Sequence, residues 1–132
     1  MKKTLDKYIE ARYIYIAVRC IEVKGMDSRI ERVYIPMTET GCYILYCLIT
    51  PQHGYGIARQ VDWMTNGELT IGAGTMYGTL SKMEKDGLIE FDHEEEKRRL
   101  YRITALGREV LERELRRIER LYRNSRGEKY DG

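Results

Sequence analysis

The sequence predicts a mostly α-helical fold with one small β-hairpin and a long C-terminal helix. Three observations predict it: apolar residues recur at helical spacing through the middle of the chain, two alternating segments flank a charged tip, and a heptad-like apolar seam follows Thr104. A length of 132 residues fits a single domain with one core.

Composition argues against several classes of protein. The formal net charge is only +2, so any contact with nucleic acid would have to come from local clusters of basic residues. No apolar run is long enough to cross a bilayer, and the N-terminus has no uninterrupted secretory segment. We therefore expect a cytoplasmic protein without a membrane partner.

Residues that could carry enzyme chemistry are few. Cys20, Cys42 and Cys47 lack the paired spacing of a metal site and are expected to be reduced and mostly buried. His53 and His93 have no ligand partner at a repeated spacing. The sequence therefore predicts no metal, no cofactor and no catalytic site, and the protein is not expected to be an enzyme.

Two helices are expected at the start of the central part. The first begins near Thr38, is apolar on every side over 42–49, and ends at Pro51. The second covers 54–64, with Ile57, Val61 and Met64 at core spacing.

A short strand and a third helix follow. The segment 68–71 is predicted to be a single strand, and the helix runs from 73 to about 85. Its core stripe is Met76, Leu80 and Met83.

The remaining chain predicts a hairpin and a final helix. Strands at 88–91 and 99–103 enclose the charged tip 93–98, and Thr104 caps a helix that reaches about Arg123. The resulting order is that of a winged helix-turn-helix, in which the hairpin is the wing.

The polar face of the third helix is the candidate DNA-reading surface. With its apolar stripe on the core, the opposite face and its flanks carry Thr75, Tyr77, Gly78, Ser81, Lys82 and Lys85. Gly78 allows close approach to a groove, and the lysines can neutralise phosphates. Taken alone, the same pattern also fits an ordinary solvated face.

The first half of the wing is acidic and the second half is basic. Lys97, Arg98, Arg99 and Arg102 cluster in the second half and could follow phosphate or a minor groove, with Arg98 the strongest candidate. The acids at 92 and 94–96 cancel that charge. An ion-paired loop without DNA contact is the alternative.

A set of motifs in order resembles the PadR family of bacterial transcriptional regulators. The matching segments are Tyr43-Ile44-Leu45, His53-Gly54-Tyr55-Gly56-Ile57, Gly74-Thr75-Met76-Tyr77-Gly78-Thr79-Leu80, Glu84-Lys85-Asp86-Gly87-Leu88-Ile89 and Leu100-Tyr101-Arg102-Ile103-Thr104-Ala105-Leu106-Gly107-Arg108. They span roughly residues 37 to 111.

The resemblance implies a dimeric, repressor-like protein whose third helix enters the major groove. Thr75, Tyr77 and Lys82 are among the implied DNA contacts. Tyr55 is a further candidate, although Tyr55 and His53 could instead pack the turn between the first two helices. The acidic wing departs from the more basic wings typical of the family.

The final helix carries an apolar seam that a lone helix cannot bury. Its residues are Leu111, Leu115, Ile118 and Tyr122, and packing against a second copy is the simplest way to cover them. The resemblance agrees, because the short PadR subfamily dimerises through one terminal helix. A homodimer would present two recognition helices to a pseudo-palindromic site on double-stranded DNA.

A small aromatic effector is a further candidate partner. Some PadR members bind phenolic acids or flat cationic drugs, and Tyr43, Tyr46 and Trp63 could line such a pocket. Aromatic residues at this spacing are more often part of the core.

The chain divides into four parts: an N-terminal extension at 1–36, a winged-helix domain at 37–103, a dimerisation helix at 104–126 and a tail at 127–132. The extension fits a strand or a helix, and its charge of +3 also fits a DNA-contacting arm. The predicted function is a ligand-responsive DNA-binding repressor. The alternatives are a winged-helix module that binds protein instead of DNA, and a dimer that sequesters small molecules.

Overall fold

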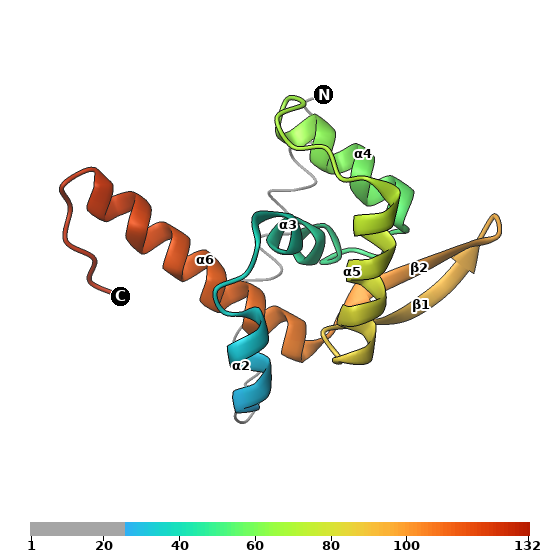
Figure 1. Cartoon of the computed structure of the whole chain (residues 1–132), viewed down its shortest axis with the longest axis horizontal. Helices are drawn as coiled ribbons and strands as arrows, with labels where there is room; N and C mark the ends of the chain where they lie inside the picture. Colours follow the sequence, from blue (N-terminus) through green and yellow to red (C-terminus); the bar gives the residue numbers. More distant parts are fainter. Residues whose placement is uncertain (1–25) are drawn as a thin grey trace.

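The computed structural model describes residues 26–132, which form five helices and one β-hairpin. The elements are α2 (Ser28–Tyr34), α3 (Glu39–Cys47), α4 (Gly54–Met64), α5 (Ala73–Lys85), β1 (Ile89–Glu95), β2 (Arg98–Ile103) and α6 (Ala105–Ser125) (Figure 1). The wing and the free end of α6 project on opposite sides of the molecule. Cys20 and most of the N-terminal extension lie outside the described residues.

The core lies where α3, α4 and α5 meet the base of the wing and of α6. Its largest fully buried residues include Ile44, Leu45, Leu48, Ile57, Met76, Met83, Leu88, Ile89 and Leu111. The predicted stripes of α4 and α5 are confirmed: Ile57, Val61, Met76, Leu80 and Met83 are buried, and Met64 is partly buried against the core. Burying each such side chain contributes about 1.5–3 kcal/mol to folding.

Side-chain caps start four of the five described helices, and at α2 the carboxylate of Asp27 accepts the backbone N–H of Arg29 over 2.8 Å. The backbone N–H of Gly41 donates to Thr38 Oγ1 over 3.0 Å, and that of Gly107 donates to Thr104 Oγ1 over 3.1 Å. His53 caps α4 in the same way, because its Nδ1 accepts the N–H of Gly56 over 2.9 Å.

The start of α6 packs directly on the turn that follows α5. A Cβ at Gly107 would lie 2.1 Å from the carbonyl oxygen of Leu88, so a side chain there has no room. This close approach joins the turn after α5 to the start of α6 at one place.

The wing is a two-stranded antiparallel sheet with a register shift between Phe91 and His93. The predicted strand at 68–71 is wrong, because that segment has no regular structure. The free edge of β2 is taken by the chain after α3: the backbones of Gln52 and Tyr101 exchange hydrogen bonds of 2.9 and 3.1 Å. Thr65 Oγ1 accepts the N–H of Leu69 over 3.0 Å and holds the segment as a loop.

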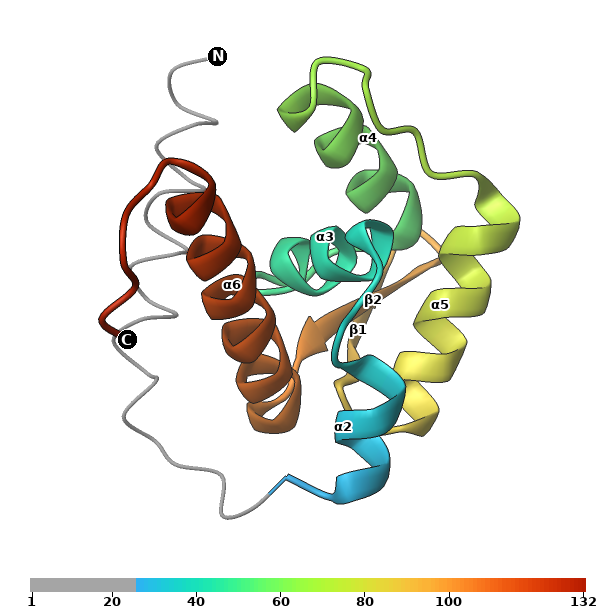
Figure 2. The ribbon, with the colours of Figure 1, turned by 60° about the vertical axis from the view of Figure 1, so that its left-hand side comes forward.

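The described end of the N-terminal extension contributes α2 to the core. Ile30 and Tyr34 of α2 are buried, so the packed unit begins ahead of Met37, where the sequence analysis began the winged-helix domain. Figure 2 shows α2 between the lower ends of α5 and α6. No helix among residues 26–132 is both long and apolar enough to span a membrane.

Candidate nucleic-acid interface

The outward face of α5 is polar and exposed. Met76, Leu80 and Met83 point into the core. The six residues predicted on the other side are all exposed: Thr75, Tyr77, Gly78, Ser81, Lys82 and Lys85. The structure therefore brings these predicted residues together on one helix face. At Gly78 the helix backbone is uncovered, because no atom other than those of its chain neighbours and the helix's own backbone lies within 4 Å of the position a Cβ would take.

Tyr77 connects this face to α4. Its side chain is 55% exposed, yet its ring lies against Gly54, where an added Cβ would be 3.0 Å from Tyr77 Cε1. The small residue at the start of α4 thus lets the ring sit between the two helices of the helix-turn-helix.

The C-terminal end of α5 is held by α2, a contact that the sequence did not reveal. The Tyr34 hydroxyl donates to Asp86 over 2.7 Å, and Arg29 pairs with the same carboxylate at 3.2 Å. The hydrogen bond from Tyr34 lowers the pKa of Asp86, while burial and the same contact raise the pKa of Tyr34. Lys82 Nζ lies 5.5 Å from the centre of the Tyr34 ring. These contacts hold the end of α5 against α2.

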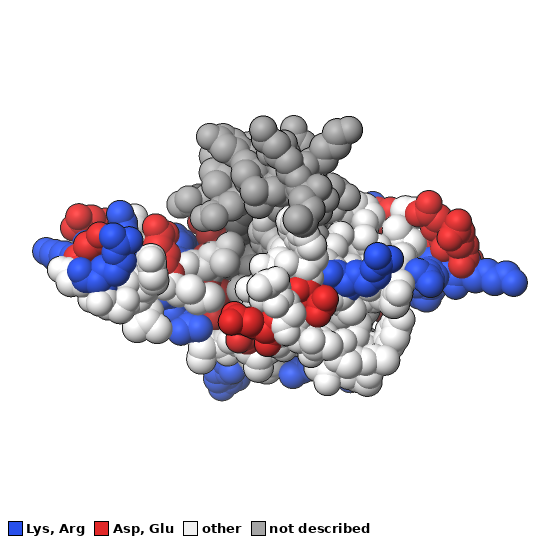
Figure 3. All heavy atoms as spheres, turned by 90° about the horizontal axis from the view of Figure 1, so that it is seen from above, with Lys and Arg blue, Asp and Glu red and all other residues white. Residues whose placement is uncertain are grey.

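Carboxylates neutralise part of the wing. Arg102 pairs with Glu90 at 2.8 Å and with Asp92 at 2.7 Å, and Arg99 lies 3.7 Å from Glu84. Acidic and basic side chains meet at the wing on the right of Figure 3. The His93 pKa is raised by its hydrogen bond to Asp92.

The tip of the wing carries charges of both signs, with Glu95 and Glu96 followed by Lys97 and Arg98. In residues 26–132, no carboxylate pairs with Lys97 or Arg98. Glu96 and Lys97 have φ of 50° and 64°, as the two central residues of a tight type I′ hairpin turn do. This turn sends Arg98 back toward α4.

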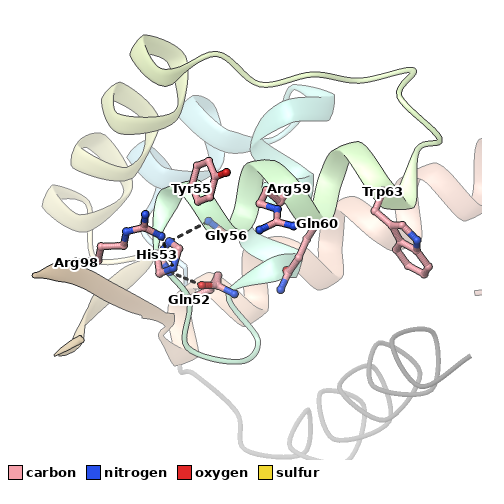
Figure 4. Close-up of a pocket in the computed structure, with 8 residues that line it drawn as sticks. All are labelled: Gln52, His53, Tyr55, Gly56, Arg59, Gln60, Trp63 and Arg98. Carbon is pink, nitrogen blue, oxygen red and sulfur yellow. Dashed lines mark hydrogen bonds between the residues drawn. The ribbon is translucent and has the colours of Figure 1, made fainter. Parts of the chain in front are cut away.

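Arg98 meets the start of α4 in a cavity of about 450 Å³ (Figure 4). Its guanidinium carbon lies 4.9 Å from the ring centre of Tyr55, and that of Arg59 lies 5.8 Å from the same ring. Tyr55 is 53% exposed. The sequence pointed to Tyr55 and Arg98 but not to Arg59, whose place depends on the wing folding back over α4.

Comparison with known protein families gives a match over the central part of the chain. The model of the transcriptional regulator PadR-like family matches residues 44–113, more than half of the chain. The chain belongs to the PadR-like family. The resemblance seen in the sequence and the predicted mostly α-helical winged fold are both confirmed. Its members are transcriptional regulators rather than enzymes.

Solved structures share the PadR-like fold. A transcriptional regulator from Clostridium thermocellum has 27% sequence identity and a TM-score of 0.59, and the match covers 78% of this chain and 97% of that one. The complex structure of hsRosR-SG has 21% identity and a TM-score of 0.52, covering 61% of this chain and 70% of that one. The second likeness concerns the fold alone.

A curated relative is much longer. An uncharacterised 37.1 kDa protein in transposon TN4556 of Streptomyces fradiae is 35% identical over 71 residues. The match covers 54% of this PadR-like chain and 20% of that protein, so the chain matches about a fifth of the relative's length.

The apolar seam of α6 divides into a buried and an exposed part. Leu111 is fully buried within its own chain, which corrects its assignment to a surface that meets a second copy. Leu115 is half-buried against the core. Ile118 and Tyr122 are 44% and 59% exposed, and Leu121 beside them is 64% exposed. The unpartnered part of the seam therefore begins after Leu115.

The three aromatic residues predicted around an effector do not line a common cavity among those described. Tyr43 and Tyr46 pack against the core from α3. Trp63 is 38% exposed and lines the cavity that contains Tyr55 and Arg98.

Proposed function

We propose that this PadR-like chain is a sequence-specific transcriptional repressor that binds double-stranded DNA as a homodimer. The observation that carries the proposal is the exposed polar face of α5, which has two lysines on a helix whose other side is locked in the core. Membership of a family of transcriptional regulators supports it independently.

In this proposal α5 lies in the major groove. Thr75, Tyr77 and Ser81 face base edges or sugar, and Gly78 lets the helix backbone approach closely. Lys82 and Lys85 bind phosphates at the groove edge, where they add affinity without sequence information. Specificity rests on a few side chains, because the net charge of +2 gives little bulk attraction.

The dimer forms through α6. Ile118, Leu121 and Tyr122 expose a short apolar patch near the free end of a 21-residue helix. Such a patch is covered when two copies pack about a two-fold axis. Two recognition helices then meet successive half-sites, and the operator is pseudo-palindromic.

An aromatic effector is the least supported part of the proposal. Trp63 is the one residue of the predicted effector set that reaches a described cavity, and Arg59 and Arg98 line the same cavity. A planar aromatic acid that binds there would quench Trp63 fluorescence and release the DNA. Quenching without any change in DNA affinity would favour a sequestering dimer instead.

A module that binds protein rather than DNA is the second candidate. Glu94, Glu95 and Glu96 are all exposed on the wing, and Glu95 lies opposite Arg98 in the strand register. A stable protein partner in a pull-down, together with absent DNA binding at low salt, would favour that function.

The proposed function is tested by a gel-shift titration with the DNA upstream of the chain's own gene. A scrambled duplex of equal length and composition is the control. We expect a discrete complex that forms on the upstream DNA at lower protein concentration than on the scrambled duplex. Equal binding to both, or to neither, would contradict the proposal.

A further inference from the structure

We propose that the concave surface between α4 and the wing tip binds the phosphate backbone of one DNA strand, with Arg59 and Arg98 both engaged on it. The inference rests on the proposed function and adds a residue of α4, Arg59, to the DNA contacts. Tyr55 acts as a spacer between the two guanidinium groups. The ligand chemistry is that of a phosphodiester: a single negative charge shared by two acceptor oxygens.

The two arginines converge on one aromatic ring, although Glu95 lies opposite Arg98 in the strand register of the wing. Their guanidinium carbons lie 5.8 and 4.9 Å from the centre of the same Tyr55 ring. Neither pairs with a carboxylate among residues 26–132, in contrast to Arg102 on the same wing. Contact with the ring limits the conformations of both side chains, so less entropy is lost when they bind an anion.

His53 supplies a second reason for an anion at this place. Its Nδ1 accepts the backbone N–H of Gly56 over 2.9 Å, so Nδ1 carries no hydrogen and the Nε2 of the neutral ring does. Burial and the nearby Arg98 lower the His53 pKa, which favours the neutral ring.

Two donors therefore face one another. Arg98 Nη1 lies 3.3 Å from His53 Nε2, and with this tautomer neither atom can accept. A phosphate oxygen set against both would accept from both and remove the unfavourable contact. Figure 4 shows the Arg98 guanidinium beside His53 on the same side of α4 as Tyr55.

The position of the cavity suits a DNA strand that borders the groove. Tyr77 of α5 packs on Gly54 at the start of α4, so the cavity adjoins the recognition helix. When α5 enters the major groove, the start of α4 and the wing tip are then next to the backbone. A cavity of about 450 Å³ that is lined by Arg59, Arg98 and Tyr55 can accept it.

The test measures DNA affinity of the full-length chain by fluorescence anisotropy at several salt concentrations. The variants are Arg59→Ala and Arg98→Ala, with Lys129→Ala as a control that removes one positive charge from the exposed C-terminal tail. Both arginine variants are exposed-site changes, and their folding is checked by thermal unfolding. Each is expected to weaken binding about tenfold, equally on upstream and scrambled DNA, and to reduce the salt slope by about one. Lys129→Ala is expected to change neither.

A duplex with single methylphosphonate linkages locates the contact. Neutralising one phosphate, or its immediate neighbour on the same strand, should abolish the effect of both arginine variants. His53→Asn, which keeps a capping acceptor and lacks the Nε2–H donor, should lose affinity at the same linkage.

Each other outcome overturns the inference. If both variants bind as the unchanged chain does while upstream DNA is still selected, the phosphate site is wrong and the proposed function stands. Loss of affinity for upstream DNA alone would indicate a base contact. If the methylphosphonate linkages that abolish the two arginine effects lie on different DNA strands, Arg59 and Arg98 do not bind one common phosphate site. Inorganic phosphate that binds the DNA-free chain at submillimolar concentration, and not Arg59→Ala, would assign the site to a free ion. No binding to any duplex at low salt would overturn the proposed function as well.

Discussion

Basic residues near the proposed DNA surface differ in the contacts that they already make within the protein. Arg102 is held by two carboxylates, whereas Lys82 lies 5.5 Å from the Tyr34 ring, near Asp86, and forms no ion pair among residues 26–132. An exposed cation–π contact is worth about 0.5–1 kcal/mol, which is small beside a charge-assisted bond to phosphate. Lys82 is therefore available to DNA, and Arg102 is not.

Replacing Lys82 by Ala should weaken DNA binding and reduce the salt slope by about one, because one phosphate contact is lost. Anisotropy titrations over a range of salt measure both quantities. An unchanged slope would remove Lys82 from the DNA contacts.

Two glycines should respond oppositely to alanine. Gly107→Ala forces a Cβ to within 2.1 Å of the Leu88 carbonyl oxygen, so we expect a loss of about 2–3 kcal/mol in the free energy of unfolding. Gly78→Ala meets open space in the middle of α5 and should gain about 0.5–1 kcal/mol, as glycine is unfavourable in a helix. Urea unfolding measures both. A neutral Gly107→Ala would contradict the close packing of α6 on the turn after α5.

At the scale of elements, α2 acts as a brace between two helices. Tyr34 and Arg29 hold Asp86 at the end of α5, and Glu31 pairs with Arg113 of α6. A carboxylate at a helix C-terminus is unfavourable by itself, and these partners offset that cost. The brace links the recognition helix to the proposed dimer helix through one short segment.

Tyr34→Phe removes the hydroxyl that donates to Asp86 and should lower the free energy of unfolding by about 1.5 kcal/mol near neutral pH. Since the folded pKa of Asp86 is depressed, its contribution is present above the unfolded value of 3.8 and is lost as pH falls through the folded value. The difference between the two proteins should therefore shrink in acid. A gap that is constant from pH 6 to about pH 2 would show that the lost contact does not depend on the Asp86 charge.

At the scale of the whole molecule, the proposed homodimer rests on the exposed apolar patch at the end of α6. Ile118→Asp places a carboxylate in the apolar patch and should shift the chain toward monomer, measured by sedimentation. Asn124→Asp adds the same charge elsewhere on the helix and should leave the dimer intact. A dimer that survives Ile118→Asp would place the contact on another surface.

The elements with a clear period were predictable from the sequence, and those fixed by distant partners were not. The core stripe of α5 follows from Met76, Leu80 and Met83 alone. The segment 68–71 is predicted to be a strand because it is short, but Gln52 already occupies the edge of β2. Seven residues of α2 are too few for a decisive period, and only the folded chain places them beside Asp86.

The candidate site also contains residues that were predictable from the sequence and residues that were not. Every predicted residue on the polar face of α5 is exposed, because one helical period determines the whole face. The meeting of Arg59 with Arg98 depends on a hairpin folding back over α4, and no local pattern signals it. Leu111 is predicted to contact a second copy but is buried within its own chain, because heptad spacing does not distinguish a core contact from a dimer contact.

The most direct test of the central claim compares the affinity of the full-length chain for upstream DNA and for a scrambled duplex at physiological salt. The account predicts salt-dependent binding that is on the order of a thousandfold tighter for upstream DNA, with two chains per duplex. Scrambling one half-site should remove most of that preference. Equal affinity for the two duplexes, or no binding at low salt, would contradict it.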